Sequence, residues 1–412
     1  MNKSSIIETA WKLDSKQVIA PQGFLASAAA AGIKKEGKLD VGLLYSRRPS
    51  IAAARFTTNA VKAAPVLLSQ EHLEESCGEI RAIFVNSGNA NACTGAEGMI
   101  VARKMAKLAG EVVAVPADQV IVCSTGVIGV PLPFDRIKQK SQELKRNLSG
   151  EGMDAVSKAI MTTDTVPKVC TAESLVGPSS VRISGMTKGA GMIHPRLATT
   201  LAFVLTDAFI TKALLEEALT EACERSYNRI TVDGDTSTND TLTVLANGAS
   251  GASLIEQKDE TYHHFLQGLT EVCQSLAQQI VRDGEGASKF VEIAIEGADC
   301  EPNATRIARS IANSPLVKTA LAGEDANWGR ILCAAGYSGV RFDPDRVGIK
   351  IGDLEVCKNG TGLSFDEALA KQILSRRDIR ITVNLNVGSS SATMWTCDLT
   401  KDYIHINADY RT

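Results

Sequence analysis

Residues 188–201 constrain the fold and the chemistry of this chain more than any other segment. They form a loop that is rich in glycine and broken by proline, reaches Ala198 and Thr199, and enters an apolar run over 201–206. That run predicts a buried strand. A peptide bond between a small residue and a hydroxyl residue, held at the mouth of a rigid strand, can be cleaved by the hydroxyl. We therefore predict that the chain cuts itself between Ala198 and Thr199.

Self-cleavage would make Thr199 the first residue of a new chain. Its freed α-amine would lie a few bonds from Oγ and titrate at about pH 8, so this threonine would carry its own base. The predicted division is an α chain, residues 1–198, and a β chain, residues 199–412. Because no linker rich in proline, glycine or serine separates them, the two halves are expected to fold together rather than as independent domains.

Composition disfavours several classes of function. A formal net charge of −3 and an aromatic content of 5% supply neither the field nor the stacking surfaces that bind nucleic acid or an anionic membrane. No apolar run reaches the roughly 18 residues that span a bilayer. Glu8 interrupts the N-terminus before the apolar segment of a secretory signal can form. We expect a soluble, cytoplasmic protein.

The cysteines and histidines do not form a recognisable ligand set. Ten cysteines are scattered singly, with no CxxC pair, which is typical of reduced thiols in a core. His263 and His264 are adjacent on an expected helix and point in different directions, while the other three histidines stand alone. A zinc site and a Ser–His–acid triad are therefore disfavoured. We predict no metal, and a base supplied by the N-terminal amine.

Apolar periodicity predicts helices and strands throughout the chain. The helical segments are 98–113, 135–148, 211–227 and 261–282, and the strand segments are 80–86, 119–124, 201–206, 242–247, 289–296 and 379–387. Strands rich in β-branched residues, interleaved with long helices, favour sheets covered by helices over an all-α or all-β fold. The predicted class is mixed α/β.

Four shorter clusters carry polar or glycine-rich patterns. Segment 123–129 is a strand end that enters a glycine turn, where amides and a hydroxyl could face a developing negative charge; an ordinary turn is the alternative. In 283–289 the upstream glycine of a phosphate loop is missing, so nucleotide binding is disfavoured, and Glu285 could instead face a cationic ligand. Clusters 86–91 and 233–240 predict hydrogen-bonded turns. The carboxylates of the second could hold a cation, but it lacks the spacing and terminal glutamate of an EF-hand loop.

As a set, these motifs resemble the ornithine acetyltransferase (glutamate N-acetyltransferase) family of arginine biosynthesis. The resemblance runs nearly from end to end, through segments 23–24, 31–35, 86–91, 124–129, 161–168, 188–201, 233–236, 283–289, 325–330 and 406–412. It implies an αββα sandwich, similar to that of N-terminal nucleophile hydrolases but connected differently. It also implies a precursor that cleaves itself into two chains, which stay associated as an α2β2 heterotetramer.

The resemblance also assigns the nucleophile. In the family this threonine follows alanine in an Ala-Thr-Met-Leu signature, which here reads Ala198-Thr199-Thr200-Leu201. The departure places a second hydroxyl beside the first. Counting from the preceding loop keeps Thr199 as the nucleophile and makes Thr200 an ordinary strand residue.

Other functional positions follow in the same way. The consecutive Thr-Gly of the family's oxyanion hole falls on Thr125 and Gly126. The family's substrate contacts fall on Thr162, Lys188, Thr199, Glu285, Asn407 and Thr412. Thr163, one residue further on, is the alternative to Thr162. A loop lysine in solvent is the alternative for Lys188.

The implied reaction is an acetyl transfer in two steps. The amine of Thr199 takes the proton from Oγ, which attacks the acetamide carbonyl of N2-acetylornithine. Ornithine leaves, and glutamate then takes the acetyl group from the Thr199 ester. Lys188 is expected to pair with a substrate carboxylate and Glu285 with the terminal ammonium of ornithine. No cofactor is expected; members of the family differ in whether acetyl-CoA also donates the acetyl group, and no residue here decides this.

Two other functions are compatible with the same residues. An amidohydrolase or aminopeptidase could use the same self-made threonine with water as the acceptor. A binding or scaffold protein could keep the fold and never cleave. The identity of the acceptor separates the two enzymes, and self-cleavage separates both from the scaffold.

Overall fold

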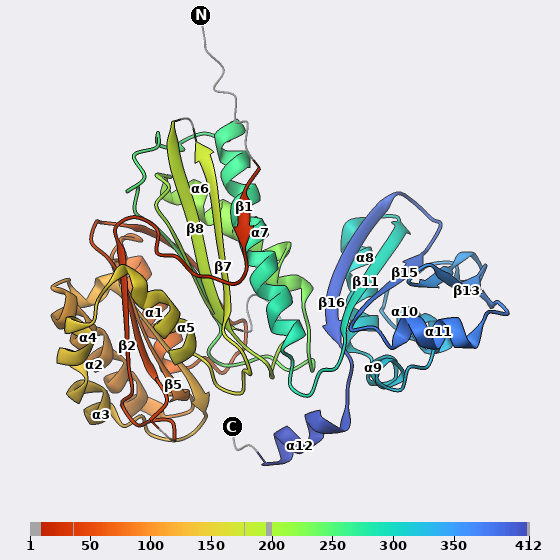
Figure 1. Ribbon diagram of the computed structural model, residues 1–412, viewed down its shortest axis with the longest axis horizontal. Coiled ribbons are helices and arrows are strands. Elements are labelled where there is room, and N and C mark those ends of the chain that lie inside the picture. Colours follow the sequence, from red (N-terminus) through yellow and green to blue (C-terminus); the bar gives the residue numbers. More distant parts are fainter. Residues whose placement is uncertain (1–9, 36, 177, 195–199, 410–412) are drawn as a thin grey trace, which may run out of the picture.

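The structure is a computed structural model, and it describes residues 10–35, 37–176, 178–194 and 200–409. These residues form three sheets together with the helices that cover them. Two sheets lie in one body, and the third belongs to a C-terminal lobe beside it (Figure 1). No helix within the described ranges is long and apolar enough to cross a membrane.

The first sheet is built from the N-terminal third of the chain. Its four strands follow the order β2 (Phe24–Ala29), β3 (Val41–Ser46), β5 (Ala82–Asn89) and β6 (Val120–Val127). Pairing is antiparallel except between β5 and β6, which are parallel. Its outer face is covered by α1 (Ala64–Glu75), α2 (Gly95–Val113), α3 (Phe134–Gln139) and α4 (Ser141–Arg146). The short helix α5 (Met153–Ala159) packs on β2 and β3.

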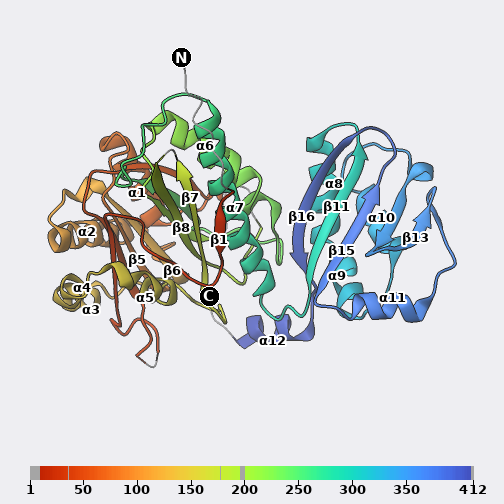
Figure 2. The same ribbon diagram turned by 45° about the horizontal axis from the view of Figure 1, so that its top comes forward.

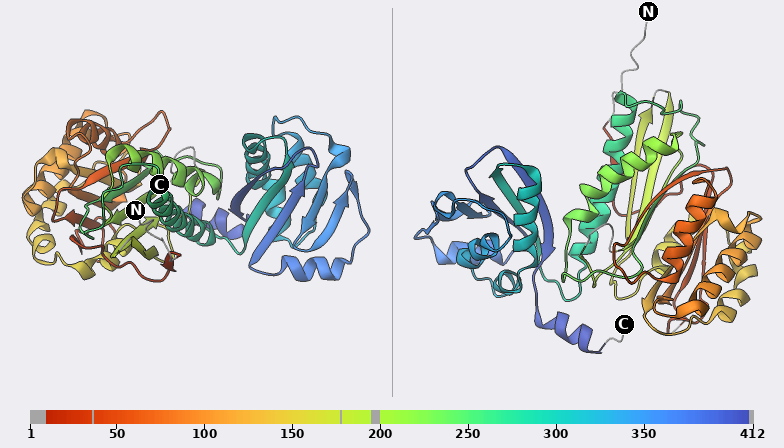
Figure 3. Two further views of the ribbon diagram at one scale, coloured as in Figure 1. Left: turned by 90° about the horizontal axis from the view of Figure 1, so that it is seen from above. Right: turned by 180° about the vertical axis from the view of Figure 1, so that it is seen from behind.

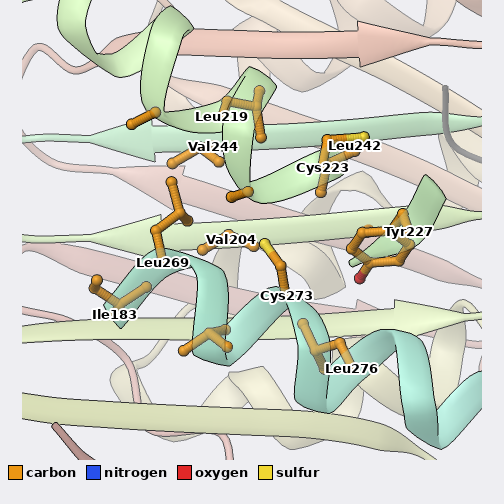
Figure 4. Close-up of a cluster of buried hydrophobic side chains, with 14 of the residues drawn as sticks. Ile183, Val204, Leu219, Cys223, Tyr227, Leu242, Val244, Leu269, Cys273 and Leu276 are labelled. Carbon is orange, nitrogen blue, oxygen red and sulfur yellow. The ribbon is translucent and has the colours of Figure 1, made fainter. Parts of the chain in front are cut away.

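The second sheet has six strands and combines segments from both sides of the predicted cut. Their order is β1 (Lys12–Asp14), β7 (Lys168–Val176), β8 (Ser179–Lys188), β9 (Leu201–Thr206), β10 (Thr241–Ala246) and β4 (Ile51–Phe56). Only β9 and β10 are parallel. Its outer face is covered by α6 (Lys212–Glu224) and α7 (Glu260–Arg282). Figure 4 shows this layer, in which Leu219 and Cys223 of α6 and Leu269 and Cys273 of α7 lie over the strands.

The two sheets pack face to face, and consecutive residues of the inner strands serve two different cores. In β3, Leu43 contacts the helices while Leu44 faces the other sheet, and in β9 Phe203 faces the first sheet while Val204 faces α6 and α7. Successive side chains of a strand point to opposite faces, so a strand buried on both faces reads as a continuous apolar run. This layering is the αββα sandwich that the resemblance to the family implies.

Strands β8 and β9 bring the two ends of the predicted cleavage loop together. They are antiparallel neighbours, and Lys188 at the end of β8 pairs with Leu201 at the start of β9. The loop between them therefore leaves and re-enters the sheet at one point. The boundary at 198 and 199 itself lies outside the described residues and stays a prediction.

The C-terminal lobe has its own sheet and its own core, which the sequence did not reveal as a separate unit. Its strand order is β14 (Thr361–Gly362), β13 (Leu354–Lys358), β12 (Gly348–Ile351), β15 (Asp378–Asn384), β11 (Phe290–Ala298) and β16 (Ser390–Cys397). Its helices are α8 (Glu301–Asn313), α9 (Pro315–Ala322), α10 (Trp328–Gly336) and α11 (Glu367–Leu374). Figures 2 and 3 show it as a distinct mass, with α7 between it and the second sheet.

A last helix, α12 (Lys401–Asp409), follows β16 and leaves the C-terminal lobe (Figure 1). It runs back beneath the sandwich, and the view from behind shows the same course (Figure 3). Its described side chains are exposed or half-buried rather than part of a core. Polar contacts, described below, connect it to the sandwich.

Most predicted elements are confirmed, with small shifts at their ends. The predicted helix over 135–148 is wrong as a single element, because α3 and α4 are separated at Lys140. The Lys140 N–H donates to Ile137 O at 2.9 Å, an i to i−3 bond that tightens the turn and redirects the chain. All ten cysteines are free, but the predicted core position holds for only six, since Cys77, Cys93 and Cys333 are exposed and Cys300 is half-buried. Short 3-10 turns lie at Ala117–Gln119, Gly150–Gly152, Tyr227–Arg229 and Pro344–Arg346.

Candidate active site

A pocket of about 130 Å³ opens where the ends of β6, β8 and β9 meet α12. Most of its lining side chains are polar. The lining residues are Ala90, Thr125, Gly126, Ile128, Thr162, Thr163, Lys188, Gly191, Met192, Thr200, Leu201, Asp233, Asp235, Ser237, Thr238, Asn239, Asp240, Glu285, Tyr403 and Asn407.

The structure brings predicted site residues from distant parts of the chain to this pocket. They are Thr125, Gly126, Thr162, Lys188, Glu285 and Asn407. Thr163, the alternative to Thr162, lines the pocket as well. The remaining predicted residues lie outside the described part of the chain: Ala198, Thr199 and Thr412. Thr200, the next residue after Thr199, is on the pocket wall. The role of each residue stays a prediction.

The predicted oxyanion turn is held by close approach of two backbones. Gly126 has φ +130°, and a Cβ there would overlap the backbone of Gly88 and Asn89 on β5. Only glycine combines this positive φ with so close an approach. The pairing of β5 and β6 becomes irregular at this point, and both Thr125 and Gly126 line the pocket.

A buried amide network supports the turn from behind. Asn239 Nδ2 donates to Ala90 O at 2.6 Å and to Ser124 O at 2.9 Å. Ser124 Oγ donates to Asn86 Oδ1 at 2.6 Å, and Asn86 Nδ2 donates to Asn89 O at 2.9 Å. The clusters at 86–91 and 233–240, predicted as hydrogen-bonded turns, thus bond to one another around the strand that carries Thr125.

Two carboxylates hold the glycine-rich loop that follows β8. Asp164 Oδ1 accepts the N–H of Gly189 at 2.7 Å. Asp233 accepts the N–H groups of Met192 and Ile193 at 2.6 and 2.9 Å. Because these bonds fix backbone groups rather than side chains, they keep the described part of the loop, up to 194, in one path.

Lys188 lies at the end of β8, on the wall that faces the oxyanion turn. Its Nζ donates to Thr125 Oγ1 at 3.4 Å. Burial lowers the pKa of Lys188, although the Asp164 carboxylate acts in the opposite direction. The lysine is half-buried and lines the pocket, which argues against a loop lysine fully in solvent.

A buried ion-pair cluster lies behind Thr162. Lys168 Nζ contacts Asp164 Oδ1 at 2.6 Å and Asp283 Oδ2 at 2.5 Å, and the Lys168 side chain is fully buried. Asp164 Oδ2 also accepts the N–H of Thr162 at 2.8 Å. Burial would raise the pKa of Asp164, but Lys168, Lys188 and the hydrogen bonds outweigh it and hold that pKa below its usual range.

Glu285 presents its carboxylate over a glycine. Its N–H donates to Ala190 O at 2.9 Å, which ties it to the glycine-rich loop. A Cβ on Gly191 would overlap the Glu285 carboxylate, so the glycine makes room for the acid. Asn407 Nδ2, from α12, donates to Glu285 Oε2 at 2.8 Å.

Among the described residues, three polar contacts attach α12 and the preceding Thr400 to the sandwich side of the pocket. Besides the Asn407 bond, Tyr403 Oη donates to Asp233 Oδ2 at 3.4 Å, and Thr400 Oγ1 donates to Gly286 O at 2.7 Å. Burial, reinforced by the Asp233 charge, raises the pKa of Tyr403, so this hydroxyl stays protonated at neutral pH. Gly286, at φ +68°, allows the backbone of Tyr403 to approach closely.

The charges of the pocket favour a ligand with both an anionic and a cationic end. Lys188 is the single cationic side chain among the described lining residues. The acidic lining residues are Asp233, Asp235, Asp240 and Glu285. A ligand with one carboxylate and one or two amines complements this arrangement.

The sequence did not single out several of these residues. Asp164 and Lys168 are four residues apart, a spacing that is common in exposed helical pairs, and their burial is visible only in three dimensions. Asp240 and Asp233 belong to the cluster predicted as a turn, and Tyr403 lies in a helix without a distinctive motif. The only available signal was the density of acids at 233–240.

Comparisons with known proteins identify relatives across nearly the whole chain. A curated arginine biosynthesis bifunctional protein ArgJ of Symbiobacterium thermophilum is 50% identical over 397 residues, 96% of this chain and 98% of that protein. Its namesake in Caldanaerobacter subterraneus is 47% identical over 404 residues, 97% and 99% of the two chains. A solved ornithine acetyltransferase of Mycobacterium tuberculosis, complexed with ornithine, is 40% identical over 46% of this chain and all of that chain, with a TM-score of 0.42.

The match to a protein family also covers nearly the whole chain. The pattern of the ArgJ family matches residues 25–412, which include every described residue of the pocket. The chain therefore belongs to the ArgJ family.

Proposed function

We propose that this chain transfers an acetyl group from N2-acetylornithine to glutamate through an ester on Thr199, after cleaving itself between Ala198 and Thr199. The observation that carries the proposal is the pocket, where the Thr125–Gly126 turn, Lys188 and Glu285 meet beside the start of β9. Membership of the ArgJ family supports the place of this reaction in arginine biosynthesis.

The proposed chemistry uses groups on opposite walls of the pocket. The hydroxyl of Thr199 attacks the acetamide carbonyl, and its own α-amine takes the proton. The turn at Thr125 and Gly126 stabilises the oxyanion, and each well-placed donor contributes roughly 3 kcal/mol to that step. Lys188 binds a substrate carboxylate, and Glu285 binds the terminal ammonium of ornithine.

The assay that tests this function incubates the purified protein with glutamate and either acetylornithine or acetyl-CoA. Acetylglutamate formed from acetylornithine, with an equal amount of ornithine released, supports the proposal. Free acetate in place of acetylglutamate would identify an amidohydrolase instead. Acetylglutamate formed from acetyl-CoA would show that the enzyme also accepts acetyl-CoA as an acetyl donor.

Glu285→Gln is expected to raise the KM for acetylornithine by about tenfold or more while changing that for acetylglutamate, the donor of the reverse reaction, much less. Glutamine keeps the size of the side chain and still accepts the Asn407 hydrogen bond, so the change isolates the charge. The measurement is steady-state kinetics in both directions. Equal losses for the two acetylated substrates would contradict the assignment of Glu285 to the ornithine side chain.

Gly286→Ala is expected to lower kcat/KM by about ten- to a hundredfold, because the new Cβ would overlap the backbone of Tyr403 and displace α12 with Asn407. Gly251→Ala is the matched control, since Gly251 has φ +75° but open space around its Cβ position. The control measures the cost of the positive φ alone. Equal kinetics for the two variants would show that the position of α12 does not matter for catalysis.

A further inference from the structure

Two buried polar atoms on the pocket wall have no hydrogen-bond partner within the described structure. They are Thr200 Oγ1 and Asp240 Oδ2. The residues are only 3% and 2% exposed, and both line the pocket. Leaving a buried polar group unbonded is costly, so such groups in a pocket point to a ligand that bonds them.

The two residues lie side by side because of the sheet. Strands β9 and β10 are parallel, and Leu201 pairs with Thr241. The N–H of Thr241 donates to the carbonyl of Thr200 at 2.8 Å, which extends the ladder to the residues just before the strands. Thr200 and Asp240 therefore occupy the same position at the start of neighbouring strands, next to the predicted nucleophile in the chain.

The surroundings of Asp240 do not satisfy its second oxygen. Ser237 hydrogen-bonds the carboxylate, and Lys188 acts on it through its charge. No hydrogen bond joins Lys188 to Asp240 in the described part of the chain, where the Nζ bonds Thr125 instead. Burial raises the pKa of Asp240 well above its usual range. A bound cation would offset this burial and favour the charged carboxylate.

The unbonded atoms call for a donor. A carboxylate oxygen accepts hydrogen bonds, and a threonine hydroxyl can accept one as well. An amino group carries up to three N–H donors and a positive charge, so it satisfies both atoms at once. A second carboxylate would be repelled, and an acetylated nitrogen, which is neutral and has one N–H, satisfies at most one of them.

We propose that Asp240 and Thr200 form an amine subsite, which binds the free α-amino group of the amino acid that accepts the acetyl group. This inference rests on the proposed acetyl transfer. The subsite holds the amino acid as its ammonium beside the acetyl ester, where the α-amine of Thr199 takes one of its protons. The neutral amine then attacks the ester carbonyl, and its second proton passes to the departing Thr199 Oγ. An amino acid held in this way outcompetes water. It thereby separates a transferase from a hydrolase that uses the same nucleophile.

The decisive variant is Asp240→Asn. Its KM for glutamate should rise on the order of tenfold to a hundredfold, with a rise in the acetate released per acetylglutamate formed. Ornithine should also become a weaker product inhibitor, because it presents the same free amine. Ornithine release from acetylornithine in the absence of glutamate should persist, since that step begins with a neutral amide.

Thr200→Val provides a second, milder variant and removes only the hydroxyl. We expect this variant to raise the KM for glutamate by about threefold to tenfold, again with more acetate released per acetylglutamate formed. Thr243→Val is the matched control: Thr243 Oγ1 is also buried without a partner, on β10, but does not line the pocket. The control should keep the acetate fraction and the KM for glutamate of the unaltered protein.

The outcomes separate the subsite from the reaction itself. If Asp240→Asn forms acetyl-protein and keeps both the KM for glutamate and the acetate fraction, the amine subsite is wrong. An equal rise in the KM for acetylornithine and the KM for glutamate would also overturn the proposal, because that pattern reflects a general distortion of the pocket. If Asp240→Asn does not cleave itself, Thr200→Val and Thr243→Val are compared instead. The amine subsite is then wrong if the two variants have the same KM for glutamate and the same acetate fraction. If the unaltered protein releases no ornithine, the proposed function fails instead.

Discussion

Replacing Thr199 by alanine is expected to leave one uncut chain of 43.8 kDa with kcat reduced by about a thousandfold or more. The substitution removes the hydroxyl that would break the bond after Ala198 and that would later carry the acetyl group. The unaltered protein should instead give two bands of nearly equal size on a denaturing gel. Mass spectrometry and N-terminal sequencing should show that the second chain begins at Thr199.

Two neighbouring variants make this result specific. Thr199→Ser keeps a hydroxyl and an α-amine, so it should still cut and retain part of the activity. Thr200→Val should still be cut at the same bond, because Thr200 is assigned to the pocket wall. Cleavage that persists in Thr199→Ala would move the nucleophile to another residue, and loss of cleavage in Thr200→Val would identify that residue as Thr200.

Replacing Lys168 by methionine is expected to lower the free energy of unfolding by about 3–5 kcal/mol. The change leaves the carboxylates of Asp164 and Asp283, which are 0% and 8% exposed, without their shared cation. Chemical denaturation at neutral pH measures the loss. Lys158→Met removes an exposed pair with Asp154 and should cost less than about 1 kcal/mol. A similar small loss for both variants would show that the buried cluster contributes little.

The pH dependence of this loss follows from Asp164. Its pKa is held below the usual range in the folded protein, so its stabilising effect is complete above its unfolded pKa of about 3.9 and is lost as the pH falls through the folded pKa. In Lys168→Met the main cation is gone and burial raises that pKa. The difference in stability between the two proteins should therefore narrow as the pH falls from the raised pKa in Lys168→Met through the lowered pKa in the unaltered protein. A difference that stays constant down to pH 2 would assign the loss to packing.

Local patterns were sufficient to predict sheets covered by helices, whereas the αββα order of the layers was implied by the resemblance to the family. Strand β9 was predicted with its observed ends, because a strand buried on both faces reads as a continuous apolar run, here from Leu201 to Leu205 with the buried Thr206 at its end. The helix at 135–148 was wrong, since apolar spacing does not show the break at Lys140. The C-terminal lobe was not anticipated as a unit, because its sheet pairs strands as distant as β11 and β16.

Comparison of motifs also predicted the family, which the relatives confirm. Six of the residues that line the pocket were predicted in the same way: Thr125, Gly126, Thr162, Lys188, Glu285 and Asn407. Thr162 and Thr163 both line the pocket, so the structure does not choose between them.

By itself, the sequence determined most of the strands and helices, the glycines that permit close approach, and the candidate nucleophile at Thr199. These depend on residues that are close together in the chain. Only the tertiary structure decided which acids are buried, paired or unpartnered. Lys168 meets Asp283 across 115 positions in the chain, and Asp240 lies beside Thr200 because two parallel strands start together. Burial and partnership are properties of packing, and packing joins segments whose order in the chain does not reveal their contact.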